Sequence, residues 1–319
     1  MKRISLDIEK KFTLITFVII FSFFLFLPLI TDNFYYLSVA TTAFIYIIFA
    51  TSWDVFAGYA HLMNFGHALF VGIAGYITAY LDMAYHLPPV FVVLMCFLSC
   101  GLLGIFIGFV TLRHRGPYFA MMTIAFGAVA HESTIMFSDY TGGEEGISGI
   151  SSLTSSWTGD YYAILLTMLV VFLVLLLYTR SRYGLLLKAI HQNEDAVAAS
   201  GINVSLTKIY SYSLSGAICG VGGSLFAYSF MHVGPTSFEQ VLSTTIIIMA
   251  MVGGMGTIIG PFFGATLLTL LNEALRELSD YRLLIYTILV VFIIYFAPKG
   301  LINIFSRVLK KVNLFREYH

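Results

Sequence analysis

The residues best suited to chemistry are polar side chains and glycines inside the otherwise apolar stretch 58–76. Asn64 and His67 can donate and accept hydrogen bonds, and Gly66 lets the backbone break or approach another helix closely. Polar groups at such a break can face a solute, so these three residues are predicted to line a translocation path or gate. They also suit a tight interhelical contact. His61 and His67 lack an acidic partner nearby, so no metal site is predicted.

Two further stretches combine small and hydroxyl residues in the same way. Thr123 and Gly127 lie four residues apart on one face of the segment 117–138, which suits helix packing or the lining of a channel. The stretch 248–265 is so rich in glycine that an ordinary helix is weakened there, which predicts a sharp turn or a re-entrant hairpin. Its predicted path residues are Gly253, Gly254 and Gly256.

The chain lacks the sequence patterns of the common catalytic sites. No glycine is followed by lysine, so there is no phosphate-binding loop of the form G-x-x-x-x-G-K-[ST]. A nucleophile elbow and an H-E-x-x-H motif are also missing. Basic residues do not alternate with aromatic ones as on a nucleic-acid surface. These observations predict a protein that is not an enzyme, binds no cofactor of its own and has no nucleic-acid partner.

The amino-acid composition indicates which kind of secondary structure carries these residues. The chain is 59% hydrophobic and only 11% charged, whereas soluble domains carry roughly 25% charged residues. The apolar runs are continuous, unlike the alternating strands of a membrane barrel. We therefore predict an all-α polytopic membrane protein, embedded in lipid as one domain over residues 1–319. Its apolar segments are 12–30, 37–55, 67–82, 88–112, 117–138, 160–179, 208–230, 240–256, 260–276 and 281–298.

The distribution of basic residues predicts the orientation. With the N-terminus in the cytoplasm and alternating spans, 15 of the 17 Lys and Arg residues lie inside, and only Arg276 and Arg282 lie outside. Both termini are therefore predicted to be cytoplasmic. Ten spans, or eight with two re-entrant segments, satisfy the same charges. Ten spans divide as five plus five around the loop 139–160, which fits an inverted repeat.

This orientation places the hydrophilic segment 180–207 in the cytoplasm. Asn193 can cap a helix whose first turn holds Glu194 and Asp195, where negative charge suits the helix dipole. Gly201 is a natural terminator. The resulting short helix has a small-residue surface that suits the groove of a partner protein, although a solvated linker fits the same pattern. The small residues are Ala196, Val197, Ala198, Ala199 and Ser200.

Two acidic or mixed-charge patches are predicted to face outward. Glu144 and Glu145 lie in the loop 138–162, which contains no Lys or Arg. Arg276 and Glu277 belong to a polar stripe after the second glycine-rich stretch. Each patch could form an outer docking surface for a partner, and each also fits a plain solvated loop or helix end.

Seven sequence blocks occur in a fixed order between residues 64 and 265: NFGHALFVGIAGY, RHRGPYFAMMTIAFG, TGGEEGISGI, SRYGLLLKAIHQNEDAVAASGIN, LSGAICGVGGSLFAY, VGPTSF and MVGGMGTIIGPFFGA. Together with the terminal APKGL they extend to residue 301 and cover most of the chain. In this order they resemble the M-type permease of branched-chain amino-acid ABC importers.

The resemblance implies a multi-pass permease subunit in a bacterial inner membrane. It implies a homologous second permease, two cytoplasmic ATP-binding subunits that carry ATP-Mg, and a periplasmic solute-binding protein. Residues 194–201 would correspond to the cytoplasmic coupling segment, whose family pattern is E-A-A-x-x-x-G. Here the small residues and Gly201 are kept, while the acidic spacing differs.

The expected function is therefore import of branched-chain amino acids, or of a related small polar solute, by alternating access driven by the partner ATPases. A stand-alone channel or facilitator for a solute such as urea or an amide is the alternative. An ion-coupled transporter would normally hold ionisable residues at mid-membrane, and the sequence offers no convincing example.

Overall fold

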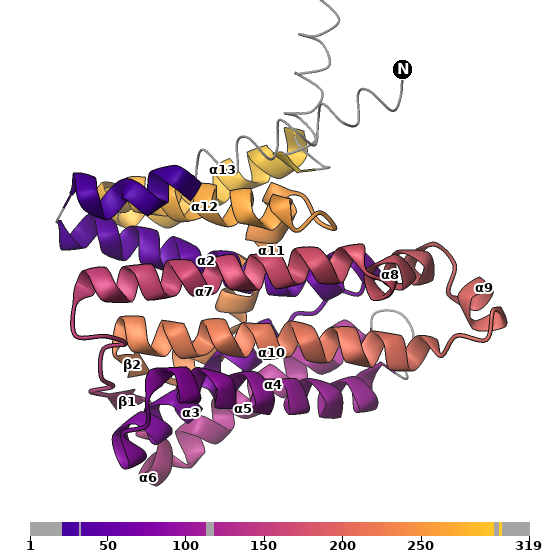
Figure 1. Cartoon of the computed structure of the whole chain (residues 1–319), viewed down its shortest axis with the longest axis horizontal. Helices are drawn as coiled ribbons and strands as arrows, with labels where there is room; N and C mark the ends of the chain where they lie inside the picture. The colour runs from indigo at the N-terminus through magenta and orange to yellow at the C-terminus, as the bar shows by residue number, and fades with distance from the viewer. Residues whose placement is uncertain (1–20, 32, 113–117, 297–299, 302–319) are drawn as a thin grey trace, which may run out of the picture.

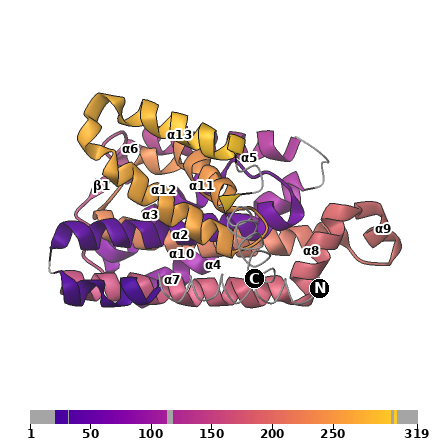
Figure 2. The ribbon, with the colours of Figure 1, turned by 90° about the horizontal axis from the view of Figure 1, so that it is seen from above.

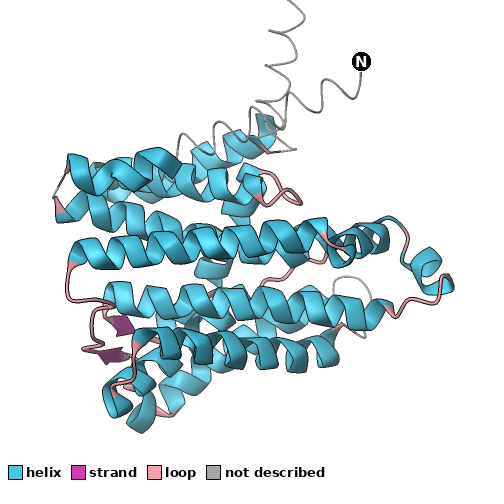
Figure 3. Ribbon diagram, viewed as in Figure 1, coloured by secondary structure: helices cyan, strands magenta, loops and turns pink. Residues whose placement is uncertain are grey.

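The computed structural model describes residues 21–31, 33–112, 118–296 and 300–301, and most of them are helical (Figures 1 and 3). An apolar helix at Phe21–Ile30 precedes α2. The elements that follow are α2 (Phe34–Ala60), α3 (His67–Tyr85), α4 (Pro89–Thr111), α5 (Tyr118–Met136), α6 (Ser138–Thr141), β1 (Ile147–Ser148), α7 (Trp157–Arg180), α8 (Arg182–Gln192), α9 (Glu194–Ala199), α10 (Val204–Phe230), β2 (His232–Val233), η1 (Pro235–Phe238), α11 (Gln240–Gly253), α12 (Ile259–Ala274), η2 (Arg276–Tyr281) and α13 (Arg282–Phe296).

Each predicted apolar segment contains a helix among its described residues, although α11 ends at Gly253, three residues before the predicted end at 256. Within the described part of the chain, six helices are long and apolar enough to cross a membrane, namely α2, α3, α4, α5, α7 and α10. This agrees with the predicted all-α polytopic membrane class. α11, α12 and α13 have 14, 16 and 15 residues, fewer than the ~20 that a full span needs. The choice between ten and eight spans therefore stays a prediction.

The core forms around α10, which packs most extensively against α4, α3 and α2. Glycines allow these helices to approach closely. A Cβ on Gly220 would lie 2.7 Å from the Cys96 carbonyl oxygen, and one on Gly223 would lie 2.8 Å from the Val71 carbonyl oxygen. α10 begins at Val204, four residues before the predicted segment, because Asn203 caps it by accepting a hydrogen bond from the Leu206 N–H.

The two ends of the helical body differ (Figures 1 and 2). At one end, called the α9 end, α8 and α9 project beyond the other labelled helices. At the opposite end, called the ribbon end, β1 pairs antiparallel with β2. The predicted outer loop is also anchored there, because Asp82 of α3 accepts hydrogen bonds from the backbone N–H and the hydroxyl of Ser151. The loop 139–160 is thus held by specific contacts as well as being solvated.

Candidate functional site: two helix breaks joined by α2

The first break separates α2 from α3 at residues 61–66. His61 ends α2 in the left-handed region, with φ 53°. Asn64 then forms a local turn, because its Oδ1 accepts a hydrogen bond from the Gly66 N–H at 2.9 Å. A Cβ at position 66 would lie 2.3 Å from the Thr123 carbonyl oxygen. Glycine is therefore required where this turn presses against α5.

His67 begins α3 inside a buried polar network. Its Nε2 lies 2.9 Å from the Ser52 hydroxyl, and its Nδ1 lies 3.3 Å from Asn64 Nδ2. Thr123 of α5 accepts from the Phe65 N–H at 3.2 Å. Four of the predicted path residues (Asn64, Gly66, His67 and Thr123) are thereby brought together, and all four are buried. In this conformation the four residues are packed together at the first break, away from solvent.

The second break is the turn 254–258 between α11 and α12, which confirms the sharp turn predicted from the glycines. Gly254 and Gly256 adopt φ values of 121° and 75°, which favour glycine. The turn is held by Asp54 of α2. Its carboxyl oxygens accept hydrogen bonds from the Gly256 N–H at 2.7 Å and the Ile258 N–H at 3.2 Å.

Asp54 is fully buried and was missed by the sequence analysis. Asp54 lies near the end of α2, which extends to Ala60, so the expectation of no ionisable residue at mid-membrane stays a prediction. An acidic residue within the apolar segment 37–55 was the available signal. Its carboxyl group is occupied by the backbone of a turn, which indicates a structural role and gives no support to ion coupling.

Three consecutive residues of α2 join the two breaks. Ser52 bonds His67, Trp53 Nε1 donates to the Asn64 carbonyl oxygen at 2.7 Å, and Asp54 holds the turn 254–258. Successive helical positions point about 100° apart, so the three side chains reach different neighbours. Of the remaining predicted path residues, Gly254 and Gly256 belong to the second break, and Gly253 ends α11 directly before it. Gly127 belongs to neither and faces η1, where a Cβ would lie 4.0 Å from the Phe238 carbonyl oxygen.

The predicted coupling helix is α9. Asn193 caps it by accepting from the Ala196 N–H at 2.9 Å, and Gly201 follows it with φ 81°; both features agree with the sequence analysis. Val197 is buried and packs with Ile190 and Val204 in a small cluster separate from the main core. The residues that this fold leaves exposed are Asp195, Ala196, Ala198, Ala199, Ser200 and Gly201.

Two sets of contacts connect α9 to the rest of the body. Glu194 forms an ion pair with the buried Lys208 of α10, with Nζ 2.8 Å from Oε2. On α8, the ring of His191 stacks on that of His61, with centroids 3.6 Å apart and planes 12° apart. Burial, and secondarily the charge of His191, lower the pKa of His61. The first break therefore directly touches the helix that precedes α9.

The predicted outer docking residues lie at the ribbon end but do not form one surface. Glu144 and Glu145 are exposed in the turn before β1. Arg276 begins η2, where its Nη1 lies 3.1 Å from Glu273 Oε1, and Glu277 beside it is exposed. β1 and the connection between α12 and α13 occupy the same end but opposite sides in Figure 1.

Comparison with known proteins identifies the class. The family model described as branched-chain amino acid transport system / permease component matches residues 35–297. The chain is 28% identical over 279 residues to the high-affinity branched-chain amino acid permease LivM of Salmonella typhimurium, covering 78% of this chain and 65% of that protein. It is 28% identical over 290 residues to LivM of Escherichia coli, covering 82% and 68%.

A sugar permease is also similar. The fructose import permease FrcC of Rhizobium meliloti is 27% identical over 207 residues, covering 60% of this chain and 57% of that protein. No solved structure gives a significant match. The family match extends from the start of α2 to the end of α13 and includes both breaks and α9. The chain therefore belongs to the family of permease components of branched-chain amino acid transport systems.

Proposed function

We propose that this chain is the permease subunit of an ABC importer that moves branched-chain amino acids into the cytoplasm. The observation that carries the proposal is α9, a capped helix that projects from one end of the body and exposes small residues. Small side chains allow the backbone of a partner to approach closely, which suits docking into a groove on an ATP-binding subunit. The proposed partners are two such subunits, which carry ATP-Mg, and a homologous second permease.

The contacts of α9 suggest how movement of the partners reaches the membrane body. A displacement of α9 acts on α10 through Glu194 and Lys208, and on α8 through Val197 and Ile190. α8 in turn stacks on the first break through His191 and His61. Ser52, Trp53 and Asp54 tie that break to the second one. Alternating access would follow from a joint rearrangement of the two breaks.

The same arrangement implies an orientation in a bacterial inner membrane. The α9 end would face the cytoplasm, in agreement with the positive-inside rule. The ribbon end, with Glu144, Glu145, Arg276 and Glu277, would face the periplasm and receive the solute-binding protein. The chain itself would bind no nucleotide, because it lacks a phosphate-binding loop.

A substitution on α9 tests the coupling role. Ala199→Arg adds a long charged side chain to an exposed helical position, so it is expected to abolish co-purification with the ATP-binding subunits while leaving the membrane body folded. Gly201→Arg should do the same, with added strain because Gly201 has φ 81°. Ser155→Arg adds the same charge at an exposed position before α7 and serves as the control. Wild-type association and transport in both α9 variants would refute the docking role.

A sugar importer is the second candidate, because FrcC is similar over more than half of the chain. Uptake measured with the complete transporter separates the two functions. Uptake of L-leucine that is not inhibited by excess D-fructose supports the amino-acid function, and the reverse result supports the sugar function. Transport by the chain without ATP-binding subunits would instead identify a stand-alone facilitator.

A further inference from the structure

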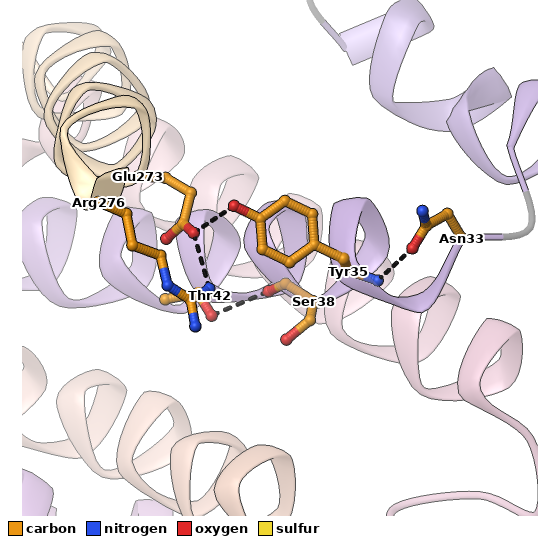
Figure 4. Close-up of polar contacts among 6 residues, drawn as sticks. All are labelled: Asn33, Tyr35, Ser38, Thr42, Glu273 and Arg276. Atoms are coloured by element: carbon orange, nitrogen blue, oxygen red, sulfur yellow. Dashed lines mark hydrogen bonds and ion pairs between the residues drawn. The ribbon is translucent and has the colours of Figure 1, made fainter. Parts of the chain in front are cut away.

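A cleft of about 840 Å³ opens between the first half of α2 and parts of α10, α11 and α12. One part of its lining is apolar and includes Val39, Met249 and Phe230. Another part is polar and includes Tyr35, Glu273 and Arg276, which face one another in Figure 4. A cleft of this size, with an apolar part and several convergent polar groups, has the form of a small-molecule site.

The polar part carries both signs of charge within a short distance. The Tyr35 hydroxyl donates a hydrogen bond to Glu273 Oε1 at 2.5 Å, and Arg276 Nη1 lies 3.1 Å from the same oxygen (Figure 4). The Arg276 guanidinium also lies 5.7 Å from the Tyr35 ring centre. Tyr35 therefore holds the carboxylate in place from α2, while Arg276 supplies the positive charge from the start of η2.

Thr269 supplies an independent observation about the polar groups of the cleft lining. The two other threonine hydroxyls of the cleft bond the carbonyl oxygen four residues earlier in their own helix, Thr42 to Ser38 and Thr245 to Val241. The Thr269 hydroxyl is buried and has no hydrogen-bond partner among the described residues. Buried polar groups are nearly always satisfied, so this hydroxyl, on a residue of the cleft lining, favours an occupant with a polar group.

We propose that this cleft binds a zwitterionic α-amino acid with an aliphatic side chain. Its carboxylate would pair with Arg276, its ammonium group with Glu273, and its side chain would lie against Val39 and Met249. An α-amino acid carries its ammonium and carboxylate groups on the same α-carbon, which matches two opposite charges placed side by side. This inference rests on the proposed importer function and deepens it by naming a substrate-contacting region on this chain.

A neutral sugar fits these features less well. Hydroxyl groups can satisfy Thr269, but a polyol carries no charge that complements Glu273 or Arg276. Charge-assisted hydrogen bonds are roughly twice as strong as neutral ones, so a zwitterion gains contacts here that a polyol does not. The cleft thus favours the amino-acid function over the sugar function.

The chain contains a natural reporter for occupancy of this cleft. Phe34 lines the cleft, and its ring lies 4.5 Å from that of Trp157, centre to centre. The other tryptophan, Trp53, is buried between the two breaks. Binding in the cleft is therefore expected to change tryptophan fluorescence through Trp157, and calorimetry provides a readout that does not depend on either ring.

The test uses the full chain in lipid nanodiscs, titrated with four probes. L-leucine is compared with 4-methylpentanoic acid, which lacks the ammonium group, with 3-methylbutylamine, which lacks the carboxylate, and with D-fructose. We expect saturable binding of L-leucine and binding of each other probe that is at least about tenfold weaker, since one charge-assisted hydrogen bond is worth roughly that factor. No saturable response to L-leucine, or equal binding of D-fructose, overturns the proposal.

Three variants test which group of the ligand each cleft residue binds. Arg276→Gln should remove the preference for L-leucine over 3-methylbutylamine, and Glu273→Gln should remove the preference over 4-methylpentanoic acid. Thr269→Val should weaken L-leucine binding several-fold without lowering the melting temperature, because no internal hydrogen bond is lost. Glu132→Gln, an exposed acidic residue on α5 outside this cleft, is the control. Unchanged preferences in both charge variants would refute the assignment.

Failure of this inference is distinguishable from failure of the proposed function. If the complete transporter imports L-leucine while the Glu273, Arg276 and Thr269 variants import it at the wild-type rate, the cleft is not a substrate site and the importer function stands. If the complete transporter imports no L-leucine, the function fails, whatever the isolated chain binds.

Discussion

Replacing Asp54 by asparagine tests how strongly α2 holds the second break. Asp54 accepts hydrogen bonds from two backbone N–H groups of the turn 254–258, at 2.7 and 3.2 Å. Asparagine keeps one acceptor oxygen but directs its amide N–H₂ at the other donor. One charge-assisted hydrogen bond is thereby lost, which is worth about 1.5–3 kcal/mol.

Hydrogen exchange measures this loss directly. We expect the amides of Gly256 and Ile258 to exchange about 10- to 150-fold faster in Asp54→Asn, because each 1.4 kcal/mol of local opening energy corresponds to roughly a factor of ten. Mass spectrometry of a peptide that covers the turn provides the readout. The exchange rate of α4 should stay unchanged, because the substitution acts locally.

A more severe variant and a matched control complete the experiment. Asp54→Ala leaves two backbone donors unpaired at about 1–3 kcal/mol each, so it is expected to lower the melting temperature strongly or to prevent folding. Asp139→Asn makes the same chemical change at an exposed position in α6 and should change neither quantity. If Asp54→Asn folds and the turn exchanges at the wild-type rate, Asp54 does not hold the break.

Three other substitutions follow from the contacts described above. Gly66→Ala should destabilise the protein by about 1–3 kcal/mol in a detergent unfolding assay, because its Cβ would lie 2.3 Å from a Thr123 backbone oxygen. Lys208→Met should accelerate hydrogen exchange over α9 roughly fivefold, an effect of about 1 kcal/mol, since Glu194 loses its partner but is partly exposed. His191→Gln should raise the pKa of His61, as measured by NMR on histidine-labelled protein, because part of the lowering comes from His191. In the wild type, the lowered pKa of His61 means that the folded protein favours the neutral ring. The contribution of His61 to folding stability is therefore complete above pH 6.5 and is lost as the pH falls below 6.5.

Each of these predictions has a matched control. Gly127→Ala should be neutral or slightly stabilising, because the nearest atom would lie 4.0 Å from the new Cβ. The double variant Glu194→Gln/Lys208→Met removes both charges and should slow the exchange again, since an uncompensated charge is the costly state. His86→Gln, at an exposed site after α3, should not move the His61 titration. Equal effects of Gly66→Ala and Gly127→Ala would contradict the packing argument.

The sequence predicted those features that depend on local patterns. The apolar segments became helices because continuous apolar runs of this length have few other folded forms. Asn193 and Gly201 delimit α9 because capping and left-handed geometry depend on a few neighbouring residues. The turn at Gly254 and Gly256 followed from glycine content for the same reason.

Features that depend on contacts between distant residues were not accessible from the sequence. Asp54 and Gly256 are 202 residues apart, and Tyr35 and Glu273 are 238 apart, so no periodicity connects them. β1 and β2 are too short to give a strand pattern and form only because Ile147 meets Val233. Several polar candidates were predicted as path residues, whereas the structure also shows which of them satisfy one another, as Asn64 and His67 do.

The small cluster of Ile190, Val197 and Val204 has a consequence for which sequence changes this protein can tolerate during evolution. These three residues lie within 15 positions of one another, and the main core does not include them. The position of α9 therefore depends on residues that are close to it in the sequence. Its side chains at Ala198 and Ala199 are exposed. Substitutions there can retune recognition of a partner without a penalty in membrane folding. Residues 193–203 could accordingly be replaced by the equivalent stretch of another permease, and the rest of the chain is expected to fold as before.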